Sequence, residues 1–216
     1  MPPITGRESA RGRRELDPGT HGLTTENVPR PATGPGVFGN DHLLELEVGS
    51  GKGTFLLGES SARPDVNFLG IEYARRYWLF AADRLRRAER ANARVVLAEA
   101  YTFLRDFLQD ESLAGVHVYF PDPWPKTRHH KRRLLKPKTV ALLATKMMPG
   151  ARLSIATDHR EYFEEIQAAV GISALIAVPF GSTAAALPEE LVGSNFERKY
   201  RLEGRPLFTL SARKRG

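Results

Sequence analysis

Short apolar runs alternate with helical patterns along most of the chain, beginning at Leu43. The runs predict strands at 43–48, 67–73, 93–99, 115–122, 151–158, 173–180 and 206–212. Between them, segments starting at 53, 74, 101, 138 and 160 have apolar positions three or four residues apart and predict helices. This alternation is typical of an α/β fold with a mostly parallel sheet and helices on both faces. The last strand follows an irregular segment at 181–205, so we expect it to run antiparallel at or near a sheet edge.

The helix predicted at 74–91 has an apolar stripe, which we expect to consist of Tyr77, Phe80, Ala81 and Leu85. Residues 1–35 show no such periodicity and are rich in Gly, Pro, Thr, Arg and Glu. We therefore expect a flexible basic N-terminal arm over residues 1–35 and one domain over residues 36–216.

Composition narrows the classes of protein to consider. The chain has no run of 18 apolar residues, so no membrane span is predicted. The N-terminus lacks the apolar core of a secretory signal. Cysteine is absent, which excludes disulfides, thiolate metal sites and cysteine nucleophiles and favours a cytoplasmic protein. The net charge of +7 favours polyanionic partners such as nucleic acid, with simple solvated surface charge as the alternative.

A glycine-rich loop, EVGSGKGTF, follows the first predicted strand. It does not fit a P-loop, because glycine is missing five positions before its Gly-Lys pair and no hydroxyl follows that pair. It does not fit the dinucleotide pattern either, because Thr54 occupies the third glycine position. An acid followed by glycines suits a ligand with amines and hydroxyls, such as S-adenosylmethionine, and an ordinary strand-to-helix turn is the alternative. The residues of this pattern are Glu47, Gly49, Gly51 and Gly53.

Acidic residues stand at the ends of the first five predicted strands. They are Glu47, Glu72, Glu99, Asp122 and Asp158. Ligands of open parallel sheets bind beyond the carboxyl ends of the strands, and an acid in the position of Glu72 commonly binds ribose hydroxyls. A single strand-end acid is usually a helix cap or a solvated carboxylate, but five in register favour a shared site.

The most specific stretch is YFPDPWPKTRHHKRRLL, residues 119–135. Three prolines stiffen the chain around Asp122 and Trp124. An ionised carboxylate accepts hydrogen bonds only, so Asp122 suits the N1 and N2 donors of guanine. Trp124 either stacks on a base or serves as a hydrophobic plug that anchors the loop.

The same stretch continues in a basic run that includes Lys126, Arg132 and Arg133. Beside an acidic and aromatic pocket, such a run predicts contacts with RNA phosphates, whereas a solvated face is the simpler alternative. Lys126 is predicted to approach a substrate phosphate or carbonyl, with a local carboxylate as its alternative partner. The adjacent pair His129 and His130 does not predict a metal site, because neighbouring residues rarely face one ion.

Five blocks of the chain resemble, in order, the bacterial tRNA (guanine-N7)-methyltransferases, which use S-adenosylmethionine. The blocks are VFGNDHLLELEVGSGKGTF, NFLGIEY, YFPDPWPKTRHHKRRLL, ATDHREYF and SNFERKY, within residues 37–213. The resemblance implies a Rossmann-like class I methyltransferase fold and methylation of guanine 46 in the variable loop of tRNA.

The resemblance also implies roles for individual residues. Glu47, Glu72, Glu99 and Asp122 match the family's cofactor-binding acids, and Asp122 also matches its proposed catalytic residue. The positions that match substrate contacts are Lys126, Asp158, Ser194, Asn195, Phe196 and Glu197. Glu99 and Ser194 depart from the Asp and Thr usual in the family. The alternatives are a methyltransferase that acts on a small molecule or a protein, and a non-catalytic RNA-binding protein.

Overall fold

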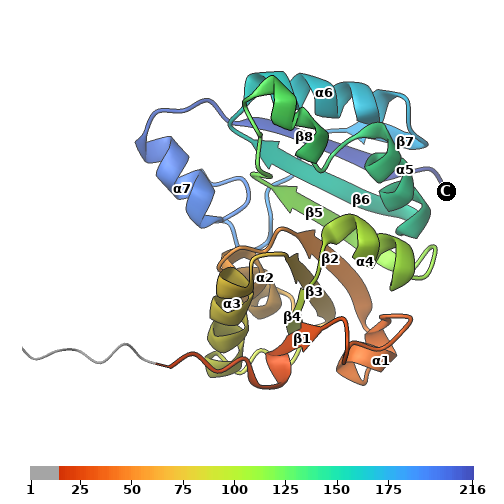
Figure 1. Cartoon of the computed structure of the whole chain (residues 1–216), viewed down its shortest axis with the longest axis vertical. Helices are drawn as coiled ribbons and strands as arrows, with labels where there is room; N and C mark the ends of the chain where they lie inside the picture. Colours follow the sequence, from red (N-terminus) through yellow and green to blue (C-terminus); the bar gives the residue numbers. More distant parts are fainter. Residues whose placement is uncertain (1–14) are drawn as a thin grey trace, which may run out of the picture.

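The computed structural model describes residues 15–216, and an eight-stranded sheet runs through them (Figure 1). The strands are β1 (Gly22–Thr24), β2 (Leu43–Val48), β3 (Val66–Glu72), β4 (Ala93–Leu97), β5 (Leu113–Tyr119), β6 (Met147–Thr157), β7 (Leu175–Val178) and β8 (Phe208–Lys214). Their order in the sheet is β1-β4-β3-β2-β5-β6-β8-β7. Neighbours pair in parallel except β8, which is antiparallel to β6 and β7. The predicted α/β fold with an antiparallel last strand near an edge is therefore confirmed.

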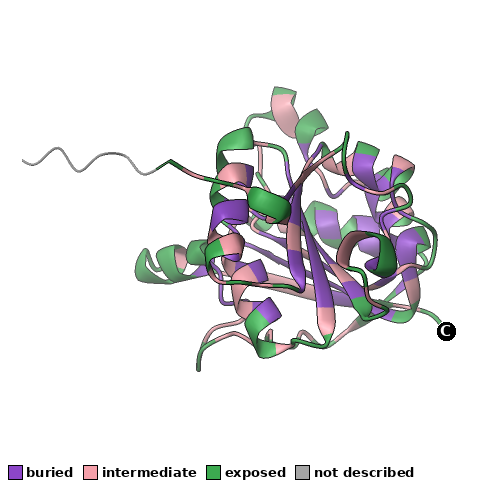
Figure 2. Cartoon of the chain, turned by 90° about the horizontal axis from the view of Figure 1, so that it is seen from below, coloured by how far each residue is buried: buried purple, intermediate pink, exposed green. Residues whose placement is uncertain are grey.

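Helices cover both faces of the sheet. They are α1 (Gly34–Phe38), α2 (Thr54–Ala62), α3 (Arg75–Arg87), α4 (Ala100–Asp106), α5 (Pro137–Lys146), α6 (Arg160–Gly171) and α7 (Asn195–Leu202), with the 3-10 turns η1 (Gly19–His21) and η2 (Thr127–Arg132). Apolar residues of α4, α5 and α6 share one core cluster, while those of α2 and α3 form a second. Figure 2 shows the buried residues concentrated in the sheet between these layers. Among the helices of residues 15–216, none has both the length and the apolar composition needed to span a bilayer.

The N-terminal prediction needs correction for residues 15–35, which are part of the fold and not a flexible arm. Strand β1 pairs in parallel with β4, and thereby satisfies backbone groups that an edge strand leaves open. Val28 and Ala32 are buried in the main core. Arg86 of α3 donates its Nε–H to the carbonyl of Asp17 at 3.0 Å. The boundary expected at residue 36 therefore separates no structural unit from residues 15–35, and residues 1–14 lie outside the described part.

Two further predictions differ from the structure. The segment 181–205, predicted to be irregular, contains α7. In α3 the expected stripe is wrong at two positions, because Tyr77 and Phe80 are 40% and 36% exposed whereas Trp78 is buried. Trp78 faces inward because its indole N–H donates to the carbonyl of Val95 at 3.1 Å while its ring packs in the core.

Gly22→Ala should destabilise the N-terminal segment. A Cβ at Gly22 would lie 2.6 Å from Cβ of Pro18 and 2.8 Å from Cζ2 of Trp78. Overpacking of this kind costs about 1–3 kcal/mol in the free energy of unfolding, which urea denaturation measures. Gly171→Ala is the matched control, because a Cβ there would meet nothing within 4 Å. Equal unfolding free energies for the two variants would contradict the packing of β1 described here.

Candidate functional site

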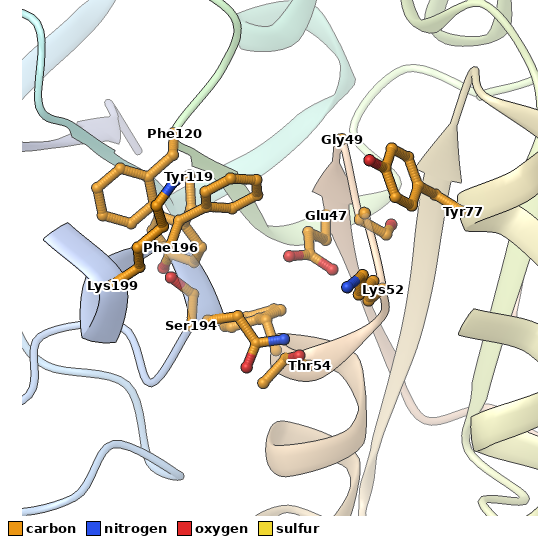
Figure 3. A pocket seen from close by; sticks show the side chains of 14 residues that line it. Glu47, Gly49, Lys52, Thr54, Tyr77, Tyr119, Phe120, Ser194, Phe196 and Lys199 are labelled. Carbon is orange, nitrogen blue, oxygen red and sulfur yellow. The ribbon is translucent and has the colours of Figure 1, made fainter. Parts of the chain in front are cut away.

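A cavity of about 290 Å³ lies at the carboxyl ends of β2 and β5 (Figure 3). Its lining comes from the glycine loop after β2, from Tyr77 of α3, from Tyr119 and Phe120 at the end of β5, and from the first turns of α7. Strand order reverses between β2 and β5, since β3 and β4 lie on one side and β6 on the other. Ligands of open α/β sheets bind at such a switch point, so the cavity lies where the sequence predicts a site.

The glycine loop needs its glycines for two reasons. Gly49, Gly51 and Gly53 have φ angles of +85°, +52° and +67°, which strongly favour glycine. A Cβ at Gly53 would also lie 2.9 Å from Cβ of Ala81, so this glycine lets α2 begin close to α3. At Gly49 and Gly51 a Cβ would meet nothing within 4 Å, which leaves space beside the backbone for a ligand.

Two acids of β2, Glu45 and Glu47, project from the same face of the strand but have opposite electrostatic environments. Glu45 accepts hydrogen bonds from both terminal nitrogens of Arg63, at 2.8 and 2.7 Å, and contacts His117 Nε2 at 2.8 Å. Burial opposes ionisation, but the hydrogen bonds from His117 and Arg63 lower the pKa of Glu45 to about 2. Glu45 is therefore ionised, and its ion pair with Arg63 has a structural role.

Glu47 is buried without such compensation. Its Oε2 has no hydrogen-bond partner among residues 15–216, although the residue lines the cavity. Burial, and secondly the negative charge of Glu72, raise the pKa of Glu47 well above its ordinary value. A buried carboxyl group that faces a cavity and lacks a cation suits a ligand ammonium group. The residues present therefore fit the amino-acid end of S-adenosylmethionine.

Glu72 and Glu99 bond to the backbone beside the cavity and do not line it. Glu72 accepts from the N–H of Gly51 at 2.7 Å through Oε2, and from the N–H of Ala74 at 2.8 Å through Oε1. It therefore holds the glycine loop against the end of β3. Glu99 caps α4 by accepting from the N–H groups of Tyr101 and Thr102 at 2.9 and 2.8 Å. Their expected contacts with the cofactor stay predictions.

The proline-rich loop after β5 carries Asp122 at the surface. Phe120 and Trp124 both have positive φ angles, of 51° and 45°, which are uncommon outside glycine and indicate local backbone strain. The Trp124 ring packs edge-on against His129, and the guanidinium of Arg132 lies 4.9 Å from its centre. Trp124 therefore anchors its own loop onto η2, and its stacking on a base stays a prediction.

Arg133 requires a correction, because its side chain is fully buried and out of reach of a phosphate. Its Nε–H donates to the carbonyl of Pro123 at 2.7 Å, and its Nη1 lies 2.6 Å from Glu165 and 3.2 Å from Glu161. Arg133 therefore ties the loop that carries Asp122 to α6. Arg132 and Lys126 are exposed, as expected of residues that contact RNA.

His130, Glu161 and Glu165 bring three possible metal-ligand atoms within 4.8 Å of one another. The Arg133 guanidinium already pairs with both acids, and its charge opposes a metal cation there. This cluster therefore gives no support to a metal site.

The expected substrate stretch 194–197 divides into structural and accessible residues. Ser194 caps α7 by accepting from the N–H of Glu197 at 3.1 Å. Glu197 is buried and accepts from the N–H groups of residues 191, 192 and 193 at 2.6, 2.8 and 3.0 Å, so its carboxylate supports the loop before α7 and is not free for substrate. Asn195 and Phe196 line the cavity, as does Ser194.

Asp158 directly follows β6, the neighbour of β5 in the sheet. Its carboxylate pairs with the guanidinium of Arg205 at 2.9 Å. The sequence reasoning missed other residues of the cavity wall, above all Tyr77, Tyr119, Phe120 and Lys199. The capping-box pattern of Ser194 and Glu197, S-x-x-E, is a sequence signal that predicts the start of α7.

Comparisons with known proteins agree with this geometry. A family model described as putative methyltransferase matches residues 41–210. A tRNA (guanine-N(7)-)-methyltransferase of Rhodopirellula baltica is 40% identical over 199 residues, which cover 89% of this chain and 73% of that protein. A protein of the same name from Mycobacterium tuberculosis strain H37Ra is 40% identical over 184 residues, covering 83% of this chain and 69% of that protein.

Solved structures add evidence on the fold. The 16S rRNA methyltransferase KamB superposes with a TM-score of 0.59 at 15% identity, covering 81% of this chain and 88% of that one. A SAM-dependent methyltransferase from Aquifex aeolicus gives a TM-score of 0.55 at 14% identity, covering 79% and 81%. This likeness and the strand order show that the chain has the class I methyltransferase fold. With these matches to the sequence and the fold, the chain belongs to the bacterial tRNA (guanine-N(7)-)-methyltransferase family.

Proposed function

We propose that the chain methylates N7 of guanine 46 in the variable loop of tRNA, as a cytoplasmic enzyme that uses S-adenosylmethionine. The main support is the convergence of two sets of residues on the cavity at the ends of β2 and β5. Glu47 and the glycine loop line it from one side, and Phe120, which stands two residues before Asp122, lines it from the other. The proposed cofactor site would thus lie next to the start of the loop proposed to recognise the base.

The cofactor half of the site rests on charge and shape. When bound, S-adenosylmethionine supplies an electrophilic methyl group on a sulfonium. Glu47 would hold its ammonium group, and the open backbone at Gly49 and Gly51 would accommodate it closely. Glu72 would keep the loop in this shape through its bond to the N–H of Gly51.

The guanine half of the site needs orientation more than proton transfer. N7 carries an in-plane lone pair that is free at neutral pH, so no general base is required for its attack. Asp122 would accept hydrogen bonds from N1–H and N2–H of guanine and thereby fix the base. Orientation of two reacting groups in this way lowers the activation free energy by several kcal/mol.

A surface beside the loop would bind the RNA backbone. Lys126, Arg128, Lys131 and Arg132 are exposed, and none forms an ion pair with another residue in 15–216. Cations that are not neutralised by neighbouring acids are available to phosphates. This surface argues against a small-molecule substrate, and the intact cofactor site argues against a non-catalytic RNA-binding protein.

The direct test is mass analysis of nucleosides from tRNA incubated with the protein and S-adenosylmethionine. We expect 7-methylguanosine to appear at position 46, and no product without the cofactor. A substrate tRNA with another base at position 46 is the matched control. Cofactor binding without methylation of any tRNA would contradict the proposal.

Cofactor affinity should rise with pH through the raised pKa of Glu47. The free protein holds Glu47 protonated below this pKa, whereas an ammonium group favours the carboxylate, so binding releases a proton. Glu47→Gln should weaken binding about tenfold to a hundredfold, since a charge-assisted hydrogen bond contributes about 1.5–3 kcal/mol. Calorimetry in buffers of different ionisation enthalpy measures both affinity and proton release.

The same shift has a consequence for folding. Because the pKa of Glu47 is raised in the folded state, the neutral carboxyl stabilises the fold at low pH, and this contribution is lost as pH rises through the folded pKa. Glu47→Gln should therefore make the ligand-free protein more stable at high pH. For the binding prediction, identical proton release on cofactor binding by the wild type and Glu47→Gln would show that Glu47 does not bind the cofactor.

Arg132 and Arg133 should respond differently to substitution by Gln. Arg132→Gln should reduce the slope of log affinity for tRNA against log salt by about 0.7–0.9, because one phosphate contact is lost. Arg133→Gln should leave this slope unchanged and lower the free energy of unfolding by about 1.5–3 kcal/mol, because it breaks buried charge-assisted hydrogen bonds. Filter binding at several salt concentrations and urea denaturation make the comparison. A smaller salt slope in the Arg133 variant, with no change in the Arg132 variant, would show that Arg133 and not Arg132 contacts a phosphate.

Asp122→Asn should lower the methylation rate by about tenfold to a few hundredfold. The amide keeps the shape but sets N–H groups against the guanine donors, which costs about 1–3 kcal/mol. Added imidazole or formate should not restore the rate, because no proton transfer is lost. Recovery of activity in proportion to the basicity of the added base would instead make Asp122 a general base.

A further inference from the structure

Three aromatic side chains, one after β5 and two on α7, meet beside the cavity, and two of them line it. Phe120 directly follows β5, and Phe196 and Tyr200 stand one turn apart on α7. The ring centre of Phe120 lies 6.3 Å from that of Phe196 and 5.5 Å from that of Tyr200, and the two rings of α7 are 5.9 Å apart. The three rings therefore form one continuous cluster.

This cluster lies outside the buried core, although Phe120 packs against the edge of that core. Phe196 is 49% exposed, and Phe120 and Tyr200 are only partly buried. Figure 3 shows the side chains of Phe120 and Phe196 on the side of the pocket opposite Tyr77. Neighbouring aromatic rings that stay open to solvent beside a pocket are typical of a binding surface.

The cluster joins the cofactor cavity to the acids of the neighbouring strand ends. Phe120 and Phe196 line the cavity, while Tyr200 extends toward Asp158 and Asp122. Burial, and secondly the negative charge of Asp158, raise the pKa of Tyr200, and Asp122 contributes in the same direction. The guanidinium of Arg205, paired with Asp158, lies 4.6 Å from the centre of the Tyr200 ring.

Backbone strain supports a functional role for the cluster. Phe120 has a φ of +51°, although its side chain gains no deep burial in return. Its N–H donates to the carbonyl of Ala156 at 2.7 Å, which holds this conformation at the end of the sheet. Strain of this kind persists where it positions a group for function.

We propose that Phe120, Phe196 and Tyr200 form a stacking wall that receives the target guanine, with Asp122 at its hydrogen-bonding edge. This inference rests on the proposed function, because it assigns the base-binding surface of that reaction. Enzymes that modify a base in folded nucleic acid take it out of its stack, and an aromatic surface replaces the stacking lost. Trp124 is less suited to this role, because its ring packs on His129 and Arg132 and, unlike that of Tyr200, has no ring contact with Phe120 or Phe196.

Tyr200→Ala is the decisive variant, with Tyr200→Phe as its conservative partner and Leu202→Ala as the control. Leu202 lies on the same helix and is 90% exposed. With saturating tRNA and cofactor, Tyr200→Ala should lower the single-turnover methylation rate about fivefold to a hundredfold, as expected for one lost base–aromatic contact. Tyr200→Phe keeps the ring and should stay within about twofold of the wild type, as should Leu202→Ala.

Two binding measurements separate stacking from a general disturbance of α7. Ser194 and Asn195 at the start of α7 line the cavity, so a displaced α7 would change the affinity for S-adenosylmethionine. We expect this affinity to be unchanged in Tyr200→Ala, because the variant removes only a ring outside the cavity lining. Affinity for tRNA should change less than about threefold, since phosphate contacts dominate it. Loss of cofactor affinity together with the rate would show that Tyr200 only holds α7 in place, and would overturn the stacking role.

A fluorescent base tests the wall without methyl transfer. 2-Aminopurine lacks the N1–H of guanine but keeps the N2 amino donor for Asp122. With this base in place of the variable-loop guanine, stacking on the wall should quench fluorescence in the wild type and in Tyr200→Phe, and Tyr200→Ala should restore it. Equal fluorescence in the wild type and Tyr200→Ala, with loss of quenching in Trp124→Ala, would overturn the proposal in favour of Trp124. Normal quenching without any methylation by the wild type would support the wall and count against the proposed function alone.

Discussion

The reversal of strand order between β2 and β5 is the constraint on which the rest of the site depends. The helix after β2 packs on one face of the sheet, and the helix after β5 packs on the other. The two connecting segments therefore diverge at the carboxyl ends of these strands and leave a crevice that no regular element fills. The glycine loop forms one wall of this crevice and the end of β5 forms the other, and α7 closes it from a third side.

Charged side chains at this edge divide into those that support the backbone and those that remain available to ligands. Glu72 and Glu197 accept from backbone N–H groups, and Arg133 donates to a backbone carbonyl. A buried charge is stable only with such partners, so these residues fix the loops in place. Glu47 Oε2 has no hydrogen-bond partner among residues 15–216, and Arg132 is exposed, so these two are the residues proposed to bind the cofactor and the RNA.

The sequence predicted the sheet well because periodicity reports burial, and every strand from β2 onward was expected within a few residues. It missed β1, because three residues on an edge are too short to show a period. It missed α7 because most of that helix is exposed and polar, so the capping pattern was its main signal. The same limit explains Arg133, since a basic run does not reveal which of its members turns inward. Only the acids of α6, 28 and 32 residues further along the chain, decide that Arg133 is buried.

Methylation at N7 leaves a positive charge on guanine, and this charge gives the exposed acid of the proline-rich loop a second use. Asp158 is already paired with Arg205, whereas no cation among residues 15–216 pairs with Asp122. In water the attraction between Asp122 and a charged base is weak, because solvent screens it. In the proposed complex, bound tRNA would cover the basic surface beside the loop and exclude water from Asp122. This would strengthen the interaction of Asp122 with the developing charge more than with the neutral base. On the proposed function, one carboxylate would both orient guanine and stabilise its charge, in a loop that Arg133 holds through the carbonyl of Pro123.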